Sequence, residues 1–253
     1  DLRLRWFQGK DNTNLMSWET KEHDVIRQRF VFTDYVIQWE KGKPLRTGEL
    51  NDDQAIAYVQ KALEKSPNDA KAQERLAEIY EKKEDFTKAI DAYKKAIELD
   101  PQEFRVYFAM AKLYLRRGQR EDAALLYRDV LRRATDEEIV QTTARKAIDL
   151  EEYLGSLGEL EKQIGPLVFL HANKPVYRRV LVEIYDRYVP PLVVRAGQGD
   201  LAAHDELLRL GERGLKPLLE ALADREDPQQ KHVALRLLGH LANKNAARPL
   251  VNL

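Results

Sequence analysis

The stretch Ala70–Thr135 decides the fold, because it contains one pattern twice. The first copy is AKAQERLAEIYEKKEDFTKAIDAYKKAIELDP (Ala70–Pro101), and the second is FRVYFAMAKLYLRRGQREDAALLYRDVLRRAT (Phe104–Thr135). Equivalent positions lie 34 residues apart: Leu76 and Met110, Ala77 and Ala111, Tyr80 and Tyr114, Ala89 and Ala123, Tyr93 and Tyr127, Ala96 and Val130. A period of this length is typical of a repeat array.

Each copy predicts a pair of helices joined by a short turn. Apolar residues recur at helical spacing on both sides of the polar turn Lys82–Asp85. Ala77 and Ala89 are small where we expect the two helices to approach most closely, since a bulky side chain there would push them apart. Pro101 ends the second helix, because proline lacks the backbone donor that the next helical turn needs.

These small and aromatic positions, in this order, resemble the signature of the tetratricopeptide repeat family. Two positions depart from it: Gln73 replaces a large residue, and Glu84 stands where a turn glycine is common, whereas Gly118 keeps that glycine in the second copy. In this family the first helices of successive repeats line a concave groove that holds a partner's peptide or helix. The resemblance therefore implies a protein-binding role.

The residues before Asn51 are harder to interpret. Asp1–Thr20 shows no clear period and is expected to form an N-terminal arm. RFVFTDYVIQWE alternates as a strand would, yet it also contains helical spacing at Phe32, Tyr35, Val36 and Trp39. Asn51–Pro67 matches a second repeat helix and needs a partner for its apolar face. We therefore favour a helix over Lys21–Lys41 and keep a β-hairpin as the alternative.

After Thr135 the pattern weakens but remains helical. Residues 136–164 predict a helical hairpin that is a degenerate repeat or a cap. Gly165-Pro166 and Asn173-Lys174-Pro175 are expected to punctuate the next two helices, and Pro190-Pro191 to interrupt the second of them. A second repeat begins near Ala202, where Leu207–Leu222 is echoed by Leu237–Leu253. This second repeat resembles the short HEAT-like repeats of bacterial proteins such as phycobilisome lyases.

Composition limits the possible functions. Apolar residues make up 43% and charged residues 33% of the 253 residues, with 42 basic and 42 acidic side chains and no cysteine. A net charge of zero gives no overall attraction to nucleic acid, so we expect no nucleic-acid partner. We find no window near the roughly 18 apolar residues of a membrane span. The chain opens on Asp1, so we expect missing residues ahead of it, and the compartment stays open between cytoplasm and periplasm.

No motif for catalysis or metal binding is convincing. The histidines form no HExxH motif, and Gly155-Ser156-Leu157-Gly158 lacks the spacing of a nucleophile elbow. Gly197–Ala202 matches GxGxxA, but the segments after it have helical periodicity instead of the βαβ unit that a dinucleotide site needs. The basic cluster at residues 116–133 is interleaved with acids. We therefore predict no catalytic residue, no metal ligand and no cofactor.

The resemblance places a partner groove on the first helices of the two copies. It predicts contacts from eight residues: Lys71, Glu74, Glu78, Arg105, Phe108, Lys112, Leu115 and Arg116. Phe108 and Leu115 would bury an apolar anchor of the partner, while Arg105 and Lys112 would meet its acidic residues. The alternative is that the neighbouring repeat or the N-terminal arm covers Phe108 and Leu115. Glu74 and Glu78 stand where family members that grip a chaperone's C-terminal carboxylate need a lysine and an asparagine, so such a clamp is not expected.

We therefore predict an all-α protein, an α-solenoid of tetratricopeptide hairpins continuing into HEAT-like hairpins. The expected parts are an N-terminal arm with an irregular first helix at 1–48, repeats at 49–137, connecting helices at 138–196 and HEAT-like repeats at 197–253. The predicted function is a non-catalytic scaffold or assembly adaptor for unidentified protein partners. The alternative is an accessory subunit of a larger bacterial enzyme or cell-envelope machine. Apolar Leu250, Val251 and Leu253 predict that another helix or subunit covers this end.

Overall fold

The structure of the protein is a computed structural model. The described residues are 3–8, 13–21, 25–32, 35–41, 46–49 and 51–211, together with 231, 235 and 239. Most of the HEAT-like repeats predicted at 197–253 therefore lie outside the described residues, because only residues 197–211 and the three single positions are described. Leu250, Val251 and Leu253 also lie outside them. The chain divides into two compact units, Asp1–Leu113 and Tyr114–Leu253, and each is described by itself.

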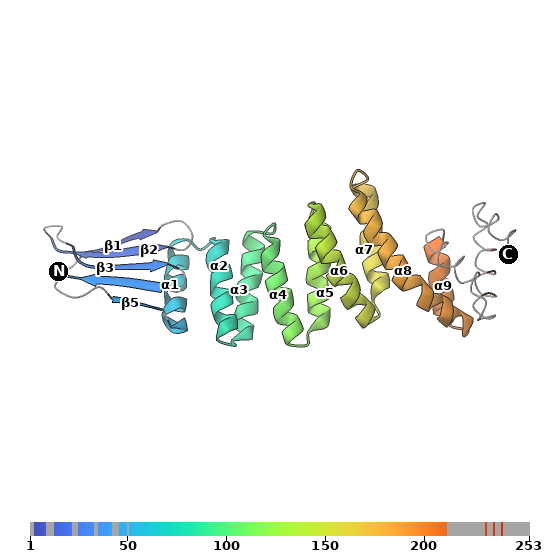
Figure 1. The fold of residues 1–253 in the computed structure, drawn as a ribbon, viewed down its shortest axis with the longest axis horizontal. Helices are drawn as coiled ribbons and strands as arrows, with labels where there is room; N and C mark the ends of the chain where they lie inside the picture. The colour runs from blue at the N-terminus through green and yellow to red at the C-terminus, as the bar shows by residue number, and fades with distance from the viewer. Residues whose placement is uncertain are drawn as a thin grey trace. The chain divides into compact units, whose positions relative to one another are not determined.

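Unit 1 begins with an antiparallel sheet instead of the arm and helix that we favoured. Its strands follow chain order: β1 (Arg3–Gln8), β2 (Asn14–Glu19), β3 (Val25–Phe32), β4 (Tyr35–Glu40) and β5 (Arg46–Glu49) (Figure 1). The helix over Lys21–Lys41 is therefore wrong. The alternation of β-branched and aromatic residues favours strands in this segment, because it gives one face of a strand a continuous apolar contact.

The sheet supplies the partner that the next helix needs. Val31 of β3 lies in one buried cluster with Ala55 of α1 (Asp52–Lys65) and Ile79 of α2 (Ala70–Lys82). Val36 lies directly opposite Val31 in the register and packs against the same cluster. The predicted helix over Asn51–Pro67 is confirmed, but its apolar face is covered by strands in place of an upstream helix.

The repeat hairpin in unit 1 is confirmed by the helices themselves. α2 pairs with α3 (Phe86–Leu99), and α4 (Phe104–Arg116) follows after the turn at Pro101. Ala77 and Ala89 are completely buried, as their small size predicted. Each of the first three helices also begins at a side-chain cap, because Asn51, Asp69 and Asp85 each accept a hydrogen bond from a backbone N–H of the first turn.

The two repeat turns share one backbone conformation. Glu84 has φ 61° and Gly118 has φ 76°, so both lie in the left-handed region. Glycine adopts this region without steric penalty, whereas a glutamate does not. Glu84 therefore adopts, without a glycine, the backbone conformation that Gly118 has in the second copy.

Unit 2 continues as helical hairpins. Its helices are α5 (Arg120–Arg133), α6 (Glu137–Leu154), α7 (Leu157–Leu170), α8 (Pro175–Gly197) and α9 (Leu201–Leu210). The breaks predicted at Pro166 and Pro190-Pro191 are wrong, because α7 and α8 run through them. Buried apolar residues on both sides, such as Val189 and Leu192 in α8, anchor the helix where prolines remove backbone donors. The α-solenoid predicted from the repeats is confirmed.

Two buried carboxylates tie the helices of unit 2 together. Glu151 of α6 is 0% exposed and accepts bonds of 2.5 and 2.6 Å from the Arg128 guanidinium of α5, and the Ser156 hydroxyl also donates to it. Glu161 of α7 is equally buried and accepts from the Tyr185 hydroxyl at 2.8 Å and from Arg209 at 2.8 Å. Each carboxylate has the charged partner that burial requires.

Among the described residues, no helix combines the length and the apolar character needed to span a lipid bilayer.

Candidate functional site

The candidate groove of unit 1 lies where α2 and α4 meet. The Arg105 guanidinium of α4 donates to the Glu74 carboxylate of α2 at 2.9 Å, which shows that these two first helices are neighbours. Arg105 keeps 68% of its side chain exposed, whereas Glu74 is only 7% exposed. The ion pair therefore joins the buried floor of this surface to its solvent-facing edge.

The faces of α4 separate into a packed side and an outer side. Val106, Tyr107, Met110, Ala111 and Leu113 are buried within the fold. Arg105 and Lys112 are exposed, and Phe108 between them is half-buried. The Tyr107 hydroxyl donates to the Pro101 carbonyl at 3.3 Å and so fixes the turn that leads into α4. The predicted division of this helix into inward and outward residues is thus present in unit 1.

The α2 side of the groove is acidic. Lys71 and Glu78 are exposed, and Arg75 binds Glu78 at 2.8 Å along the same helix. Burial raises the pKa of the Glu74 carboxyl, and Arg105 opposes that shift. Glu78 and Glu103 add to the rise because nearby negative charge disfavours ionisation. The α2/α4 surface therefore contains one partly desolvated carboxylate, Glu74, and Arg105 favours its charged form.

A buried tyrosine supports this acidic side from the second helix of the repeat. The Tyr93 hydroxyl of α3 donates to Glu81 of α2 at 3.1 Å. Burial, followed by the negative charge of Glu81, raises the pKa of Tyr93 well above its usual value. The hydroxyl therefore stays protonated and keeps donating to the carboxylate.

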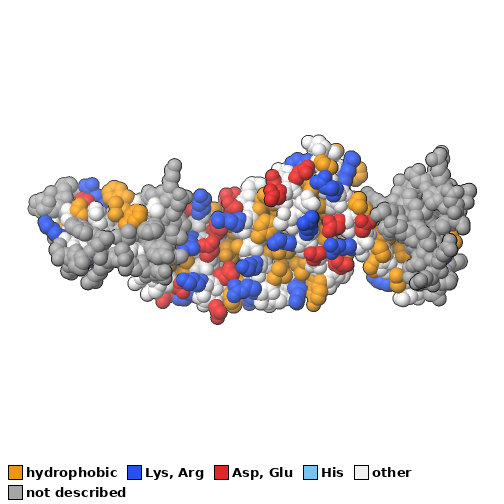
Figure 2. Space-filling view, viewed as in Figure 1, with side chains coloured by type: hydrophobic (Ala, Val, Ile, Leu, Met, Phe, Trp, Pro, Cys, Tyr) orange, Lys and Arg blue, Asp and Glu red, His pale blue; other side chains and the backbone are white. Residues whose placement is uncertain are grey.

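The structure does not bring all eight predicted residues into one unit. Lys71, Glu74, Glu78, Arg105, Phe108 and Lys112 belong to unit 1, whereas the exposed Leu115 and Arg116 on the last turn of α4 belong to unit 2. Figure 2 shows acidic and basic side chains interleaved with apolar ones over the helices that it displays. Such a surface suits a partner that presents both polar and apolar side chains.

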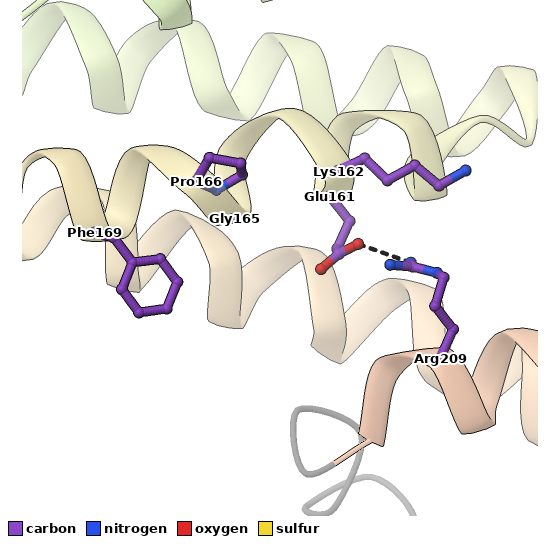
Figure 3. A pocket seen from close by; sticks show the side chains of 6 residues that line it. All are labelled: Glu161, Lys162, Gly165, Pro166, Phe169 and Arg209. Atoms are coloured by element: carbon purple, nitrogen blue, oxygen red, sulfur yellow. Dashed lines mark hydrogen bonds and ion pairs between the residues drawn. The ribbon is translucent and has the colours of Figure 1, made fainter.

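Unit 2 contains a pocket that the sequence did not reveal. It encloses about 330 Å³ and is lined by Glu161, Lys162, Gly165, Pro166 and Phe169 of α7 and by Arg209 of α9. Figure 3 shows the Glu161–Arg209 ion pair at one end and the Phe169 ring at the other. The one available signal was the proline inside a helical pattern, which we interpreted as a helix end. Glu161 and Arg209 lie far apart in the sequence, so no local sequence pattern predicts that they pair.

The histidines and glycines considered for catalysis or cofactor binding make packing contacts or connect helices. His171 stacks on Tyr177 with ring centroids 5.0 Å apart, and His204 lies 3.9 Å from Asp205. Gly197 ends α8 and Gly199 lies in the turn before α9, so GxGxxA connects two helices. Within the described residues, no group of three or more histidines and carboxylates is placed to hold a metal ion. His23, His232 and His240 lie outside these residues.

Comparison with protein families agrees with the repeat pattern. Two models, both described as tetratricopeptide repeat, match residues 53–104 and 81–146. The matches support tetratricopeptide repeats over residues 53–146. No curated protein sequence matches the chain significantly.

Solved structures with similar folds are distant. MamA is 15% identical, with 76% of this chain and 91% of that chain covered and a TM-score of 0.36. The pilF protein of Pseudomonas aeruginosa is 16% identical, with coverages of 80% and 90% and a TM-score of 0.36. YrrB, described as a tetratricopeptide repeat protein with an unusual peptide-binding site, is 15% identical, with coverages of 77% and 98% and a TM-score of 0.34.

Proposed function

We propose that this protein is a non-catalytic interaction scaffold that binds a partner peptide or helix on the α2/α4 surface of unit 1. The observation that carries this proposal is the outer side of α4. It presents Arg105, Phe108 and Lys112 beside the acidic residues of α2, and Arg105 bridges the two helices through Glu74. Tetratricopeptide repeats over residues 53–146 favour a protein partner.

The ion pairs refine which charges a partner would meet. Arg105 already binds Glu74, and Glu78 already binds Arg75. Lys71 and Lys112 are exposed and have no ion-pair partner among the described residues. The acidic groups of a partner therefore meet Lys112 and Lys71 first. Its apolar anchor packs on Phe108. Leu115 and Arg116 belong to unit 2, and their contact with a partner stays a prediction from the sequence.

The test compares what the protein captures with and without the central anchor. Full-length parent and Phe108→Ala proteins are immobilised, exposed to extract of the source cells, and the bound proteins are identified by mass spectrometry. Loss of a central anchor lowers affinity by on the order of 2 kcal/mol, roughly thirtyfold, so the partner should disappear from the variant.

Two variants serve as controls. Leu99→Ala removes an exposed apolar residue from the end of α3, and Arg132→Glu reverses an exposed charge on α5. Both should capture the partner as the parent does. Equal capture by a folded Phe108→Ala protein would place the partner away from this surface.

A further inference from the structure

The pocket of unit 2 has an apolar end with no evident task inside the fold. Phe169 is 76% exposed at the end of α7, and Pro166 is exposed one turn earlier. Gly165, directly before Pro166, also lines the pocket and contributes no side chain to it (Figure 3). An exposed aromatic ring that borders an open, apolar space is typical of a surface that packs against a partner's side chain.

The other end of the pocket offers a fixed hydrogen-bond donor. Arg209 uses Nε and Nη2 to bind Glu206 and Glu161, at distances of 2.7 to 2.9 Å. Its second terminal nitrogen, Nη1, has no hydrogen-bond acceptor in the described part of the chain. The bonds to Glu206 and Glu161 raise the pKa of Arg209, so it remains a cation. The guanidinium is held in place while one donor stays available.

The charge balance selects the kind of acceptor. Two carboxylates, Glu161 and Glu206, share the single positive charge of Arg209, and Lys162 is paired with Glu159 at 2.9 Å. A further carboxylate would meet this excess of negative charge and would be repelled. An uncharged acceptor, such as a main-chain carbonyl, suits the Nη1 donor without that penalty.

Pro166 adds a second apolar surface at the pocket. Its ring carries no N–H, so α7 has one backbone donor fewer at this position. The Arg209 donor and the apolar surfaces of Phe169 and Pro166 line the same pocket, and this combination suits an extended peptide segment.

We propose that this pocket is a second protein-binding site, which takes an extended, uncharged peptide segment of a partner. The partner's aromatic or branched apolar side chain packs against Phe169 and Pro166 over Gly165, and its main-chain carbonyl accepts from Arg209 Nη1. The site lies wholly in unit 2 and is independent of the α2/α4 surface. Its success or failure therefore leaves the proposed function of unit 1 unaffected.

The experiment uses a display library of random twelve-residue peptides, selected against the full chain. The expected result is enrichment of peptides with an apolar centre and without neighbouring Asp or Glu. Phe169→Ser should weaken the enriched peptides about tenfold, measured by fluorescence polarisation. Its matched control is Leu125→Ser, which changes a residue that is also strongly exposed, 57%, on α5 and should leave affinity unchanged.

A second variant separates binding from folding. Pro166→Ala restores the backbone donor, so α7 should become more stable while the peptides bind more weakly. Three outcomes would overturn the proposal: no enriched peptides, enrichment of acidic peptides, or equal binding by parent and Phe169→Ser. A parent dimer that the Phe169 change dissociates would also overturn it, because the occupant would then be a second copy.

Discussion

The repeat hairpin of unit 1 and the irregular helices of unit 2 are held together by different means. In unit 1, α2 and α3 pack through small buried residues, Ala77 and Ala89, and the buried ring of Tyr93. In unit 2, the buried carboxylates Glu151 and Glu161 are each tied to an arginine of another helix. Where the regular pattern of small and aromatic residues weakens, buried salt bridges therefore hold neighbouring helices together.

The two units also differ in how their cross-helix arginines are exposed. Arg128 keeps only 15% of its side chain exposed and holds a carboxylate that solvent does not reach. Arg105 is mostly exposed and holds Glu74 from the solvent side. Breaking a buried ion pair such as Arg128–Glu151 strongly destabilises the fold, because a buried charge is left without a partner. Ion pairs between exposed groups contribute little to stability.

The largest expected effect tests this difference directly. Arg128→Met should lower the free energy of unfolding of unit 2 by about 3–5 kcal/mol, since Glu151 loses its charged partner. Arg105→Met should cost less in unit 1, because Arg105 is mostly exposed and water can reach Glu74 from that side once Arg105 is removed. Both are measured by urea unfolding followed by hydrogen exchange, which reports each unit separately.

The double variant Arg128→Met with Glu151→Leu is the control for this result. It removes both charges and should recover most of the lost stability, because no unpaired carboxylate remains. Equal effects of the two single variants would show that both units are held in the same way, and the contrast would be lost.

The sequence predicted the helical repeats better than it predicted the sheet. The 34-residue spacing predicted the helices of the repeats, because repeated small residues and turns have local signatures. The sheet was missed because Phe32, Tyr35, Val36 and Trp39 also fit a helical period, and only contact of Val31 with α1 and α2 decides the matter. The α-solenoid needed only periodicity, whereas the sheet depended on a tertiary partner.

The candidate sites were predictable to different extents. The outer residues of α4 follow from helical periodicity, so Arg105 and Lys112 were placed on the exposed side correctly. The burial of Glu74 was not expected, since its bond to Arg105 depends on how two helices pack. The sequence does not predict the pocket of unit 2, because Pro166 indicates a helix end and because Arg209 lies far from Glu161 in sequence.

A smaller effect sharpens the comparison between the two repeat turns. A Cβ at Gly118 would contact nothing within 4 Å, so Gly118→Ala tests backbone strain alone and should destabilise by about 1 kcal/mol. Glu84→Gly should stabilise unit 1 by about 0.5 kcal/mol, because it relieves the left-handed glutamate and offsets the added chain entropy. Thermal unfolding of both variants checks the opposite signs. Destabilisation by both would mean that the Glu84 side chain makes a stabilising contact.

The smallest expected effect concerns pH and separates two carboxylates. Burial raises the pKa of Glu74 above its ordinary 4.5, whereas the Arg209 guanidinium lowers the pKa of Glu206 below that value. A carboxyl group whose pKa is raised on folding contributes stability to the fold that is lost as the pH rises through that range. A carboxyl group whose pKa is lowered on folding contributes stability that is lost as the pH falls. Glu74 and Glu206 should therefore respond to pH in opposite directions.

Unfolding of the parent, Glu74→Gln and Glu206→Gln proteins at pH about 6.5 and about 3.5 measures these responses. On acidification, the parent should gain stability relative to Glu74→Gln and lose stability relative to Glu206→Gln, each by about 0.5 kcal/mol, since solvent screens both groups in part. Glu74 is sensitive because Glu78 and Glu103 add negative charge to a site that only Arg105 neutralises. Glu206 behaves oppositely because Arg209 and the Tyr188 hydroxyl both donate to its ionised form. Responses of the same sign would mean that Arg105 outweighs burial at Glu74, which would make the α2/α4 ion pair equivalent to those of unit 2.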